Sequence, residues 1–164
     1  MAKGFTLLEL SLVLMITAIT VAAGLPALNR QMAMIQLKQN SATLVSYVQS
    51  ARALASSTEC QARLGLKPLG KEQVQLMLEL ENDPLLKGCA LWFETTNGPN
   101  TRQVKIAEKT IDSLTINRPL TLLFQGISGS LKAESASTIE LSSRGVHAHI
   151  TLDGIGNGVL RYVE

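Results

Sequence analysis

The chain divides into three stretches that differ in how apolar and polar positions alternate. In residues 10–28 no charged residue occurs, and most of the side chains are apolar. As a helix this stretch would be about 28 Å long, close to the roughly 30 Å hydrocarbon core of a bilayer. The first stretch therefore predicts a membrane-spanning helix.

The second stretch, residues 29–57, has no proline or glycine and shows the period of an amphipathic helix. Its apolar positions recur at three-, four- and seven-residue steps, at Leu37, Leu44, Val48, Ala51 and Ala55. Together the two stretches predict one helix from residue 5 to about residue 56, which would be about 75 Å long. Pro26 removes one backbone donor from this helix, so we expect that the helix can kink there.

The third stretch, residues 58–164, alternates apolar and polar positions in short runs that are bounded by turn residues. This is the pattern of half-buried strands. The expected strands are 74–80, 90–94, Val104 with Ile106, Leu114 with Ile116, Leu120–Phe124, Ile139 with Leu141, Val146–Leu152 and 159–163. The chain is therefore predicted to be α+β, with a long N-terminal helix whose second half packs on a C-terminal β-sheet domain.

A short motif, Lys3-Gly4-Phe5-Thr6-Leu7-Leu8-Glu9, precedes the uncharged run and places one carboxylate at its edge. A carboxylate at this position raises the free energy of membrane insertion, and such residues usually mark function. The motif resembles the processing site of type IV prepilin-like proteins. That family includes type IV pilins, minor pilins and type II secretion pseudopilins.

The resemblance implies a processing step and a role for Glu9. A prepilin peptidase would cut between Gly4 and Phe5, remove residues 1–4 as a leader, and leave Phe5 as an N-methylphenylalanine. Glu9 would then occupy the position at which the family keeps a glutamate used in assembly. Residues 5–28 would be the transmembrane part of the helix, and residues 29–57 its amphipathic part.

An ordinary signal anchor or a secretory signal peptide is the alternative for the same segment. A secretory peptide ends in small residues after its apolar run, and Ala22-Ala23-Gly24 could serve as such a cleavage site. That alternative leaves Glu9 without a role, whereas the prepilin interpretation gives its carboxylate a partner. We therefore favour the prepilin interpretation.

The C-terminal sequences TIELSSRG at 138–145 and HITLDGIG at 149–156 are similar to the end of the type II secretion H pseudopilin and FimT-like minor pilin group. The resemblance implies a minor structural subunit that acts in assembly or initiation of a type IV pilus near its tip. The alternatives are a type II secretion pseudopilin and a DNA-uptake receptor at a pilus tip. The implied partners are other pilins or pseudopilins, prepilin peptidase and an inner-membrane assembly platform.

Cys60 and Cys89 both lie beyond the uncharged run. Lys3 precedes that run, so the positive-inside rule places the N-terminus in the cytoplasm and the domain on the exported side. The resemblance implies that the chain crosses a bacterial inner membrane once, with the domain in the oxidising periplasm, before it is assembled in a pilus or pseudopilus. A disulfide persists in such an oxidising space, and closing a loop of about 30 residues would contribute roughly 3–4 kcal/mol in the chain-entropy model. We predict a Cys60–Cys89 disulfide, with two unpaired buried cysteines as the alternative.

Two features could bind ligands but are better explained as ordinary surface structure. His147 and His149 would point to one face of a strand, as two metal ligands do, but no third ligand is identifiable. The glycine-rich loop 154–158 lacks the lysine and the following helix of a phosphate-binding loop. We therefore predict no metal and no cofactor.

Composition also argues against catalysis and nucleic-acid binding. No serine, histidine and carboxylate are arranged as a nucleophilic site, so no catalytic residue is assigned and an enzyme is not expected. The formal net charge is +2 and aromatic residues make up 4% of the chain, which predicts neither strong polyanion binding nor a base-stacking surface. Acidic residues interrupt the basic positions, which are Arg102, Lys105, Lys109 and Arg118.

Overall fold

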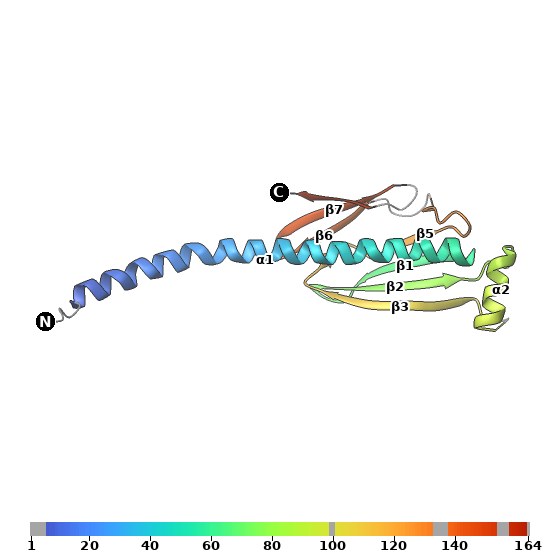
Figure 1. The fold of residues 1–164 in the computed structure, drawn as a ribbon, viewed down its shortest axis with the longest axis horizontal. Helices are drawn as coiled ribbons and strands as arrows, with labels where there is room; N and C mark the ends of the chain where they lie inside the picture. The colour runs from blue at the N-terminus through green and yellow to red at the C-terminus, as the bar shows by residue number, and fades with distance from the viewer. Residues whose placement is uncertain (1–5, 99–100, 133–137, 154–157, 164) are drawn as a thin grey trace.

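The computed structural model describes residues 6–98, 101–132, 138–153 and 158–163. One long helix, α1 (Leu7–Thr58), is followed by antiparallel strands and one short helix. Figure 1 shows that the N-terminal half of α1 extends beyond the strands, while its C-terminal half lies along them. The α+β class predicted from the sequence is confirmed.

Helix α1 begins and ends at residues with recognisable capping geometry. Thr6 has an extended backbone, and its side-chain oxygen accepts a hydrogen bond from the backbone N–H of Glu9 at 3.3 Å. The helix continues through Pro26 and curves gently in its N-terminal half (Figure 1). It ends at Thr58 because Glu59 adopts a left-handed conformation with φ of 57°.

The apolar stripe predicted on the second half of α1 is the face that packs on the domain. All five predicted positions are fully buried, namely Leu37, Leu44, Val48, Ala51 and Ala55. Ser41 is buried among them, and its hydroxyl donates to the carbonyl oxygen of Leu37 at 2.7 Å, so its polar group is satisfied. Burying side chains as large as Leu37 and Leu44 contributes about 1.5–3 kcal/mol each.

The first sheet has the strand order β3-β2-β1-β5. Its strands are β1 (Gln61–Pro68), β2 (Gln73–Glu81), β3 (Gln103–Asp112) and β5 (Leu120–Phe124). Leu64 in the central strand pairs with Leu78 on one side and Leu122 on the other, and all three are buried. The predicted alternation along β2 is confirmed, since every second residue from Val74 to Leu80 is buried.

The second sheet has the order β4-β6-β7-β8. Its strands are β4 (Thr115–Ile116), β6 (Thr138–Ser143), β7 (Val146–Leu152) and β8 (Gly158–Val163). Ile139, Leu141, Ala148 and Ile150 are buried on its inner face. Because α1 contacts β1 of the first sheet and β6 and β7 of the second, the helix is the element on which both sheets pack.

One expected strand is wrong, because residues 90–94 lie in helix α2 (Lys87–Thr96). Its two buried residues, Cys89 and Phe93, are four positions apart and therefore share one face of a helix. The run Leu91-Trp92-Phe93 is apolar at consecutive positions, and so short a run does not distinguish the period of a strand from that of a helix.

Strand β3 is present, but Ile106 does not share the buried face with Val104 as its spacing had suggested. Leu78 pairs with Ala107 and Glu79 pairs with Lys105, so Ile106 is an extra residue in a β-bulge. Ile106 is consequently 38% exposed.

Candidate functional site

Glu9 lies in the first turn of α1 and is the only charged residue in residues 7–28. Its flanking residues Leu8 and Leu10 are 75% and 58% exposed. Within the described chain, no hydrogen bond or ion pair joins the Glu9 carboxylate to another residue. The carboxylate therefore stands on the outside of an apolar helix with its acceptor oxygens free for a second molecule.

The hydroxyl side chains of this helical segment are satisfied within the helix. Ser11 donates to the carbonyl oxygen of Leu8 at 2.8 Å, and Thr17 donates to that of Val13 at 3.0 Å. Thr20 repeats the arrangement one turn later. Since unpaired polar groups are costly in hydrocarbon, these bonds make the segment compatible with lipid and leave Glu9 as its exceptional residue.

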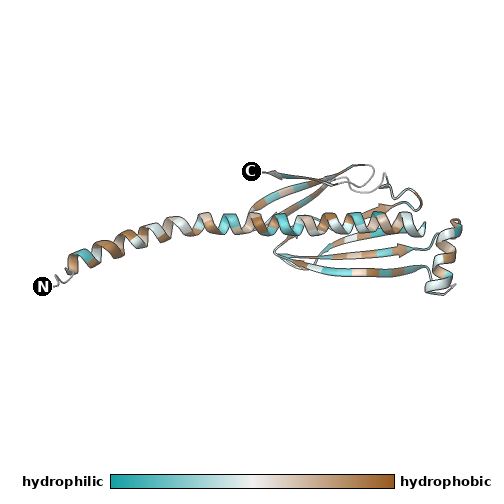
Figure 2. Ribbon diagram, viewed as in Figure 1, coloured by the Kyte–Doolittle hydropathy of each residue, from teal (hydrophilic) through white to brown (hydrophobic). Residues whose placement is uncertain are grey.

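Among the described residues, α1 is the one helix long and apolar enough to cross a membrane. None of its most apolar window is buried inside the molecule. Figure 2 shows that the predominantly hydrophobic half is the part that extends away from the domain. The length and position of this segment agree with the predicted anchor.

Gly4 and Phe5, the residues of the predicted processing site, lie outside the described residues. Cleavage between them and methylation of Phe5 remain predictions. The described chain starts at Thr6, so the cap of α1 and the position of Glu9 are the parts of the motif that have a defined geometry.

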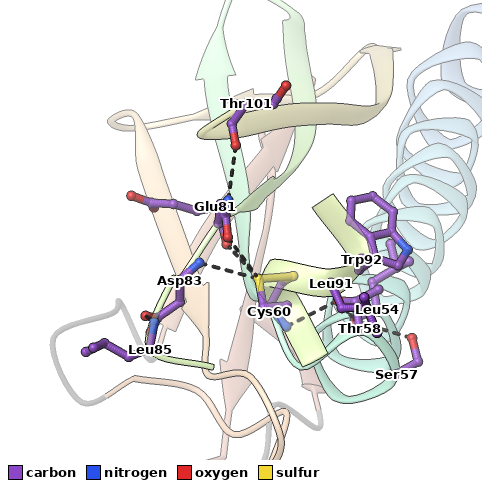
Figure 3. Close-up of a disulfide and its surroundings, with 12 residues drawn as sticks. Leu54, Ser57, Thr58, Cys60, Glu81, Asp83, Leu85, Leu91, Trp92 and Thr101 are labelled. Atoms are coloured by element: carbon purple, nitrogen blue, oxygen red, sulfur yellow. Dashed lines mark hydrogen bonds between the residues drawn. A yellow bond between two sulfur atoms is a disulfide. The ribbon is translucent and has the colours of Figure 1, made fainter. Parts of the chain in front are cut away.

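The predicted disulfide between Cys60 and Cys89 is confirmed, with Cα atoms 4.7 Å apart. Figure 3 shows the bond at the point where α1 ends and α2 begins. Both cysteines are fully buried, and the backbone N–H of Asp83 lies 3.4 Å from the Cys89 sulfur. The bond ties the end of the long helix to the segment that follows β2.

The two histidines occupy alternate positions of β7, as expected. His149 Nδ1 lies 4.0 Å from Glu140 Oε1, and the other oxygen of Glu140 accepts a hydrogen bond from Asn117 Nδ2 at 2.5 Å. In the part of the chain that the structure describes, no three His, Cys, Asp or Glu side chains are grouped to hold a metal ion. Residues 154–157 of the glycine-rich loop lie outside that part.

The predicted basic region is partly neutralised at its centre. Lys105 Nζ lies 2.6 Å from Glu108 Oε2, and the bulge at Ile106 explains how two residues three positions apart reach the same face of a strand. The hydrogen bond from Lys105 lowers the pKa of Glu108, and the same bond raises the pKa of Lys105. The region does not present an uninterrupted positive surface.

Two arginines that the sequence analysis did not single out line one cleft. Arg30, in α1, and Arg144, in the turn between β6 and β7, line the same open cleft of about 570 Å³. The sequence marks Arg30 only as the first charged residue after the uncharged run. Nothing in the sequence pairs it with Arg144, because the shared cleft depends on how the second sheet packs on α1.

Comparisons with known protein families, with curated proteins and with solved structures find no match to this chain. The architecture, a long apolar N-terminal helix followed by a C-terminal β-sheet domain, is consistent with that of pilin-like proteins.

Proposed function

We propose that this chain is a minor pilin-like structural subunit of a type IV pilus, which acts in filament assembly or initiation near the tip. The observation that carries the proposal is the position of Glu9. It is the one charge in residues 7–28, the exposed apolar part of α1, and it lies four residues after Phe5 of the sequence Lys3-Gly4-Phe5. The disulfide supports the export of the domain to an oxidising compartment.

The proposed mechanism follows from the energetics of a charge in lipid. An unpaired charge in a low-dielectric medium costs several kcal/mol. After cleavage, the new amine of Phe5 is a second charge in the same layer. Pairing Glu9 of one subunit with the Phe5 amine of its neighbour would relieve both costs and fix the axial offset between the two helices.

The apolar surface of α1 would form the core of the filament. Leu7, Leu10, Val13 and Leu14 are each more than half exposed in the single chain, and adjacent helices would cover them. The domain would stay outside this core, held on the second half of α1 by its buried stripe. This role is structural, so it requires neither a catalytic residue nor a cofactor.

The same arrangement serves a type II secretion pseudopilin, which is the alternative function. The two functions are distinguished by the filament with which the chain copurifies, a type IV pilus or a type II secretion pseudopilus. A DNA-uptake receptor is less well supported, because Glu108 neutralises Lys105 in the basic region and the terminal segment 160–164 has one arginine.

The test compares Glu9→Ala, Glu9→Gln and Glu9→Asp in a host that assembles the filament. Glu9→Gln removes the charge with little change in size, and Glu9→Asp keeps the charge, so the two form a matched pair. We expect Glu9→Ala and Glu9→Gln to insert into the membrane and keep the disulfide, but to be severely reduced in sheared, purified filaments. Glu9→Asp should retain more incorporation than Glu9→Gln.

Incorporation of Glu9→Ala and Glu9→Gln at the wild-type level would show that Glu9 is not the assembly residue. Membrane extraction and disulfide status of each variant, measured in the same cells, separate an assembly defect from a failure of insertion or folding.

A further inference from the structure

The cleft between α1 and the second sheet carries two arginines and no acidic side chain in its described lining. Arg30 and Arg144 come from opposite walls, and Asn29 adds a side-chain amide. Both arginines are exposed, and neither guanidinium has a hydrogen bond or an ion pair to another described residue. Two free guanidinium groups without a neighbouring carboxylate make a site for an anion, and a phosphate suits their forked geometry.

The position of the cleft along α1 indicates that the phosphate belongs to a lipid headgroup. Residues 10–28 span about 28 Å as a helix, which matches the hydrocarbon thickness of a bilayer. Arg30 follows two residues later and would therefore lie at the level of the lipid headgroups. An arginine on the exported side runs against the positive-inside preference, so a compensating anionic partner is expected there.

The backbone of the β6–β7 turn supports a role for the Arg144 side chain. Ser143 pairs with Val146, so Arg144 and Gly145 form a two-residue hairpin turn with φ of 45° and 81°. Positive φ at both positions favours asparagine, aspartate or glycine at the first one. An arginine is a costly choice for this backbone, and such outliers are found where the side chain has a function.

We propose that the Arg30–Arg144 cleft binds the phosphate of an anionic phospholipid in the leaflet next to the domain. One guanidinium from α1 and one from the second sheet hold the same headgroup, which fixes the orientation of the domain on the membrane surface before assembly. This inference rests on the membrane-anchored part of the proposed function and is independent of filament assembly.

The experiment uses the full chain in nanodiscs of equal parts phosphatidylcholine and phosphatidylglycerol, with native mass spectrometry of the released protein. The readout is the ratio of retained phosphatidylglycerol to retained phosphatidylcholine. We expect wild type to favour phosphatidylglycerol, and Arg30→Gln and Arg144→Gln each to lower the ratio about five-fold, which corresponds to ~1 kcal/mol per basic residue at an anionic surface. Arg144→Lys should lie between Arg144→Gln and wild type.

The matched control is Arg102→Gln, which removes the same charge at the other end of the domain. Arg102 directly precedes β3, and its backbone carbonyl oxygen accepts a hydrogen bond from the backbone N–H of Asn82. Arg102 therefore lies at the end of the domain where α1 ends, remote from the cleft. Arg102→Gln should leave the ratio unchanged. Helix content and the intact disulfide, measured on each variant, verify that the lost preference is not a folding defect.

Three results would overturn the proposal. The first is an equal ratio in wild type and in both arginine variants. The second is that the chain binds inorganic phosphate in phosphatidylcholine nanodiscs but shows no preference for phosphatidylglycerol. This result would assign the cleft to a free anion. The third is unchanged lipid retention with loss of the variants from filaments, which would assign it to a neighbouring subunit. If the chain fails to insert, both the proposed membrane anchor and the proposed headgroup site are wrong. If the chain inserts but shows no lipid preference, only the proposed headgroup site is wrong.

Discussion

The carbonyl oxygen of Glu59 occupies the space that a Cβ atom at the position of Gly126 would need. A side chain there would lie within 3.0 Å of this oxygen, and the obstacle is backbone rather than the end of a flexible side chain. Glu59 is the left-handed residue that ends α1, and the disulfide-bonded Cys60 follows it. Gly126 thus lets the segment after β5 pack against the point where the long helix enters the domain.

We expect Gly126→Ala to lower the free energy of unfolding by about 1–3 kcal/mol, because the backbone must shift to admit the methyl group. The matched control is Gly70→Ala, since no atom lies within 4 Å of a Cβ placed at residue 70. Urea unfolding of the full chain in mild detergent measures both. Equal midpoints for the two variants would contradict the close packing at Glu59.

The disulfide should be a main source of stability of the domain. Cys60 and Cys89 are separated by 29 positions, for which the chain-entropy model gives about 3–4 kcal/mol. We expect Cys60→Ser/Cys89→Ser and reduced wild type to unfold at similarly lowered urea concentrations. Thiol labelling of the exported protein without reductant should detect no free cysteine. An unchanged midpoint after reduction would show that the bond does not stabilise the fold.

Leu44 tests whether α1 is part of the core of the domain. It is fully buried, so Leu44→Ala should cost about 2–5 kcal/mol through lost burial and the cavity left behind. Met32 lies on the same helix but is 57% exposed, and Met32→Ala should change the unfolding free energy little. Near-ultraviolet circular dichroism reports the transition, because Trp92 packs edge-on against Phe93. Similar effects of the two substitutions would contradict the assignment of the buried stripe.

The Lys105–Glu108 pair predicts a small dependence of stability on pH. The pKa of Glu108 is lowered from its ordinary value of 4.5, mainly by the hydrogen bond from Lys105 and then by one from Gln75. A lowered pKa in the folded state stabilises the fold above pH 4.5, and this contribution is lost as the pH falls through the folded value. The stability difference between wild type and Glu108→Gln should therefore shrink on acidification from neutral pH. Because both side chains are exposed, the difference should also shrink with added salt.

The sequence was sufficient for the elements whose period is long or strict. The stripe from Leu37 to Ala55 repeats over several turns, and β7 alternates over seven residues, so their buried faces were predictable. Helix α2 was not, because its apolar run is too short to define a period. The bulge at Ile106 depends on the register between β2 and β3, which alternation within one strand does not encode.

The residues of the candidate sites likewise include some that could be predicted from the sequence and some that could not. The Cys60–Cys89 bond and the exposed position of Glu9 could be predicted, because two cysteines beyond the apolar run and a lone carboxylate at its edge are local signals. The Arg30–Arg144 cleft was not, because its two sides come from elements that are distant in the sequence and meet only when the second sheet packs on α1. Gly126 likewise acquires its role from the path of the chain at Glu59.

The most direct test of the proposed function is the mass of the mature chain isolated from the membranes of its native host. The proposed function requires cleavage after Gly4 and methylation of the new N-terminus. The account predicts an intact mass that starts at Phe5 and carries one added methyl group, with the Cys60–Cys89 bond in place. A chain that still starts at Met1, or one cut after Gly24, would contradict it.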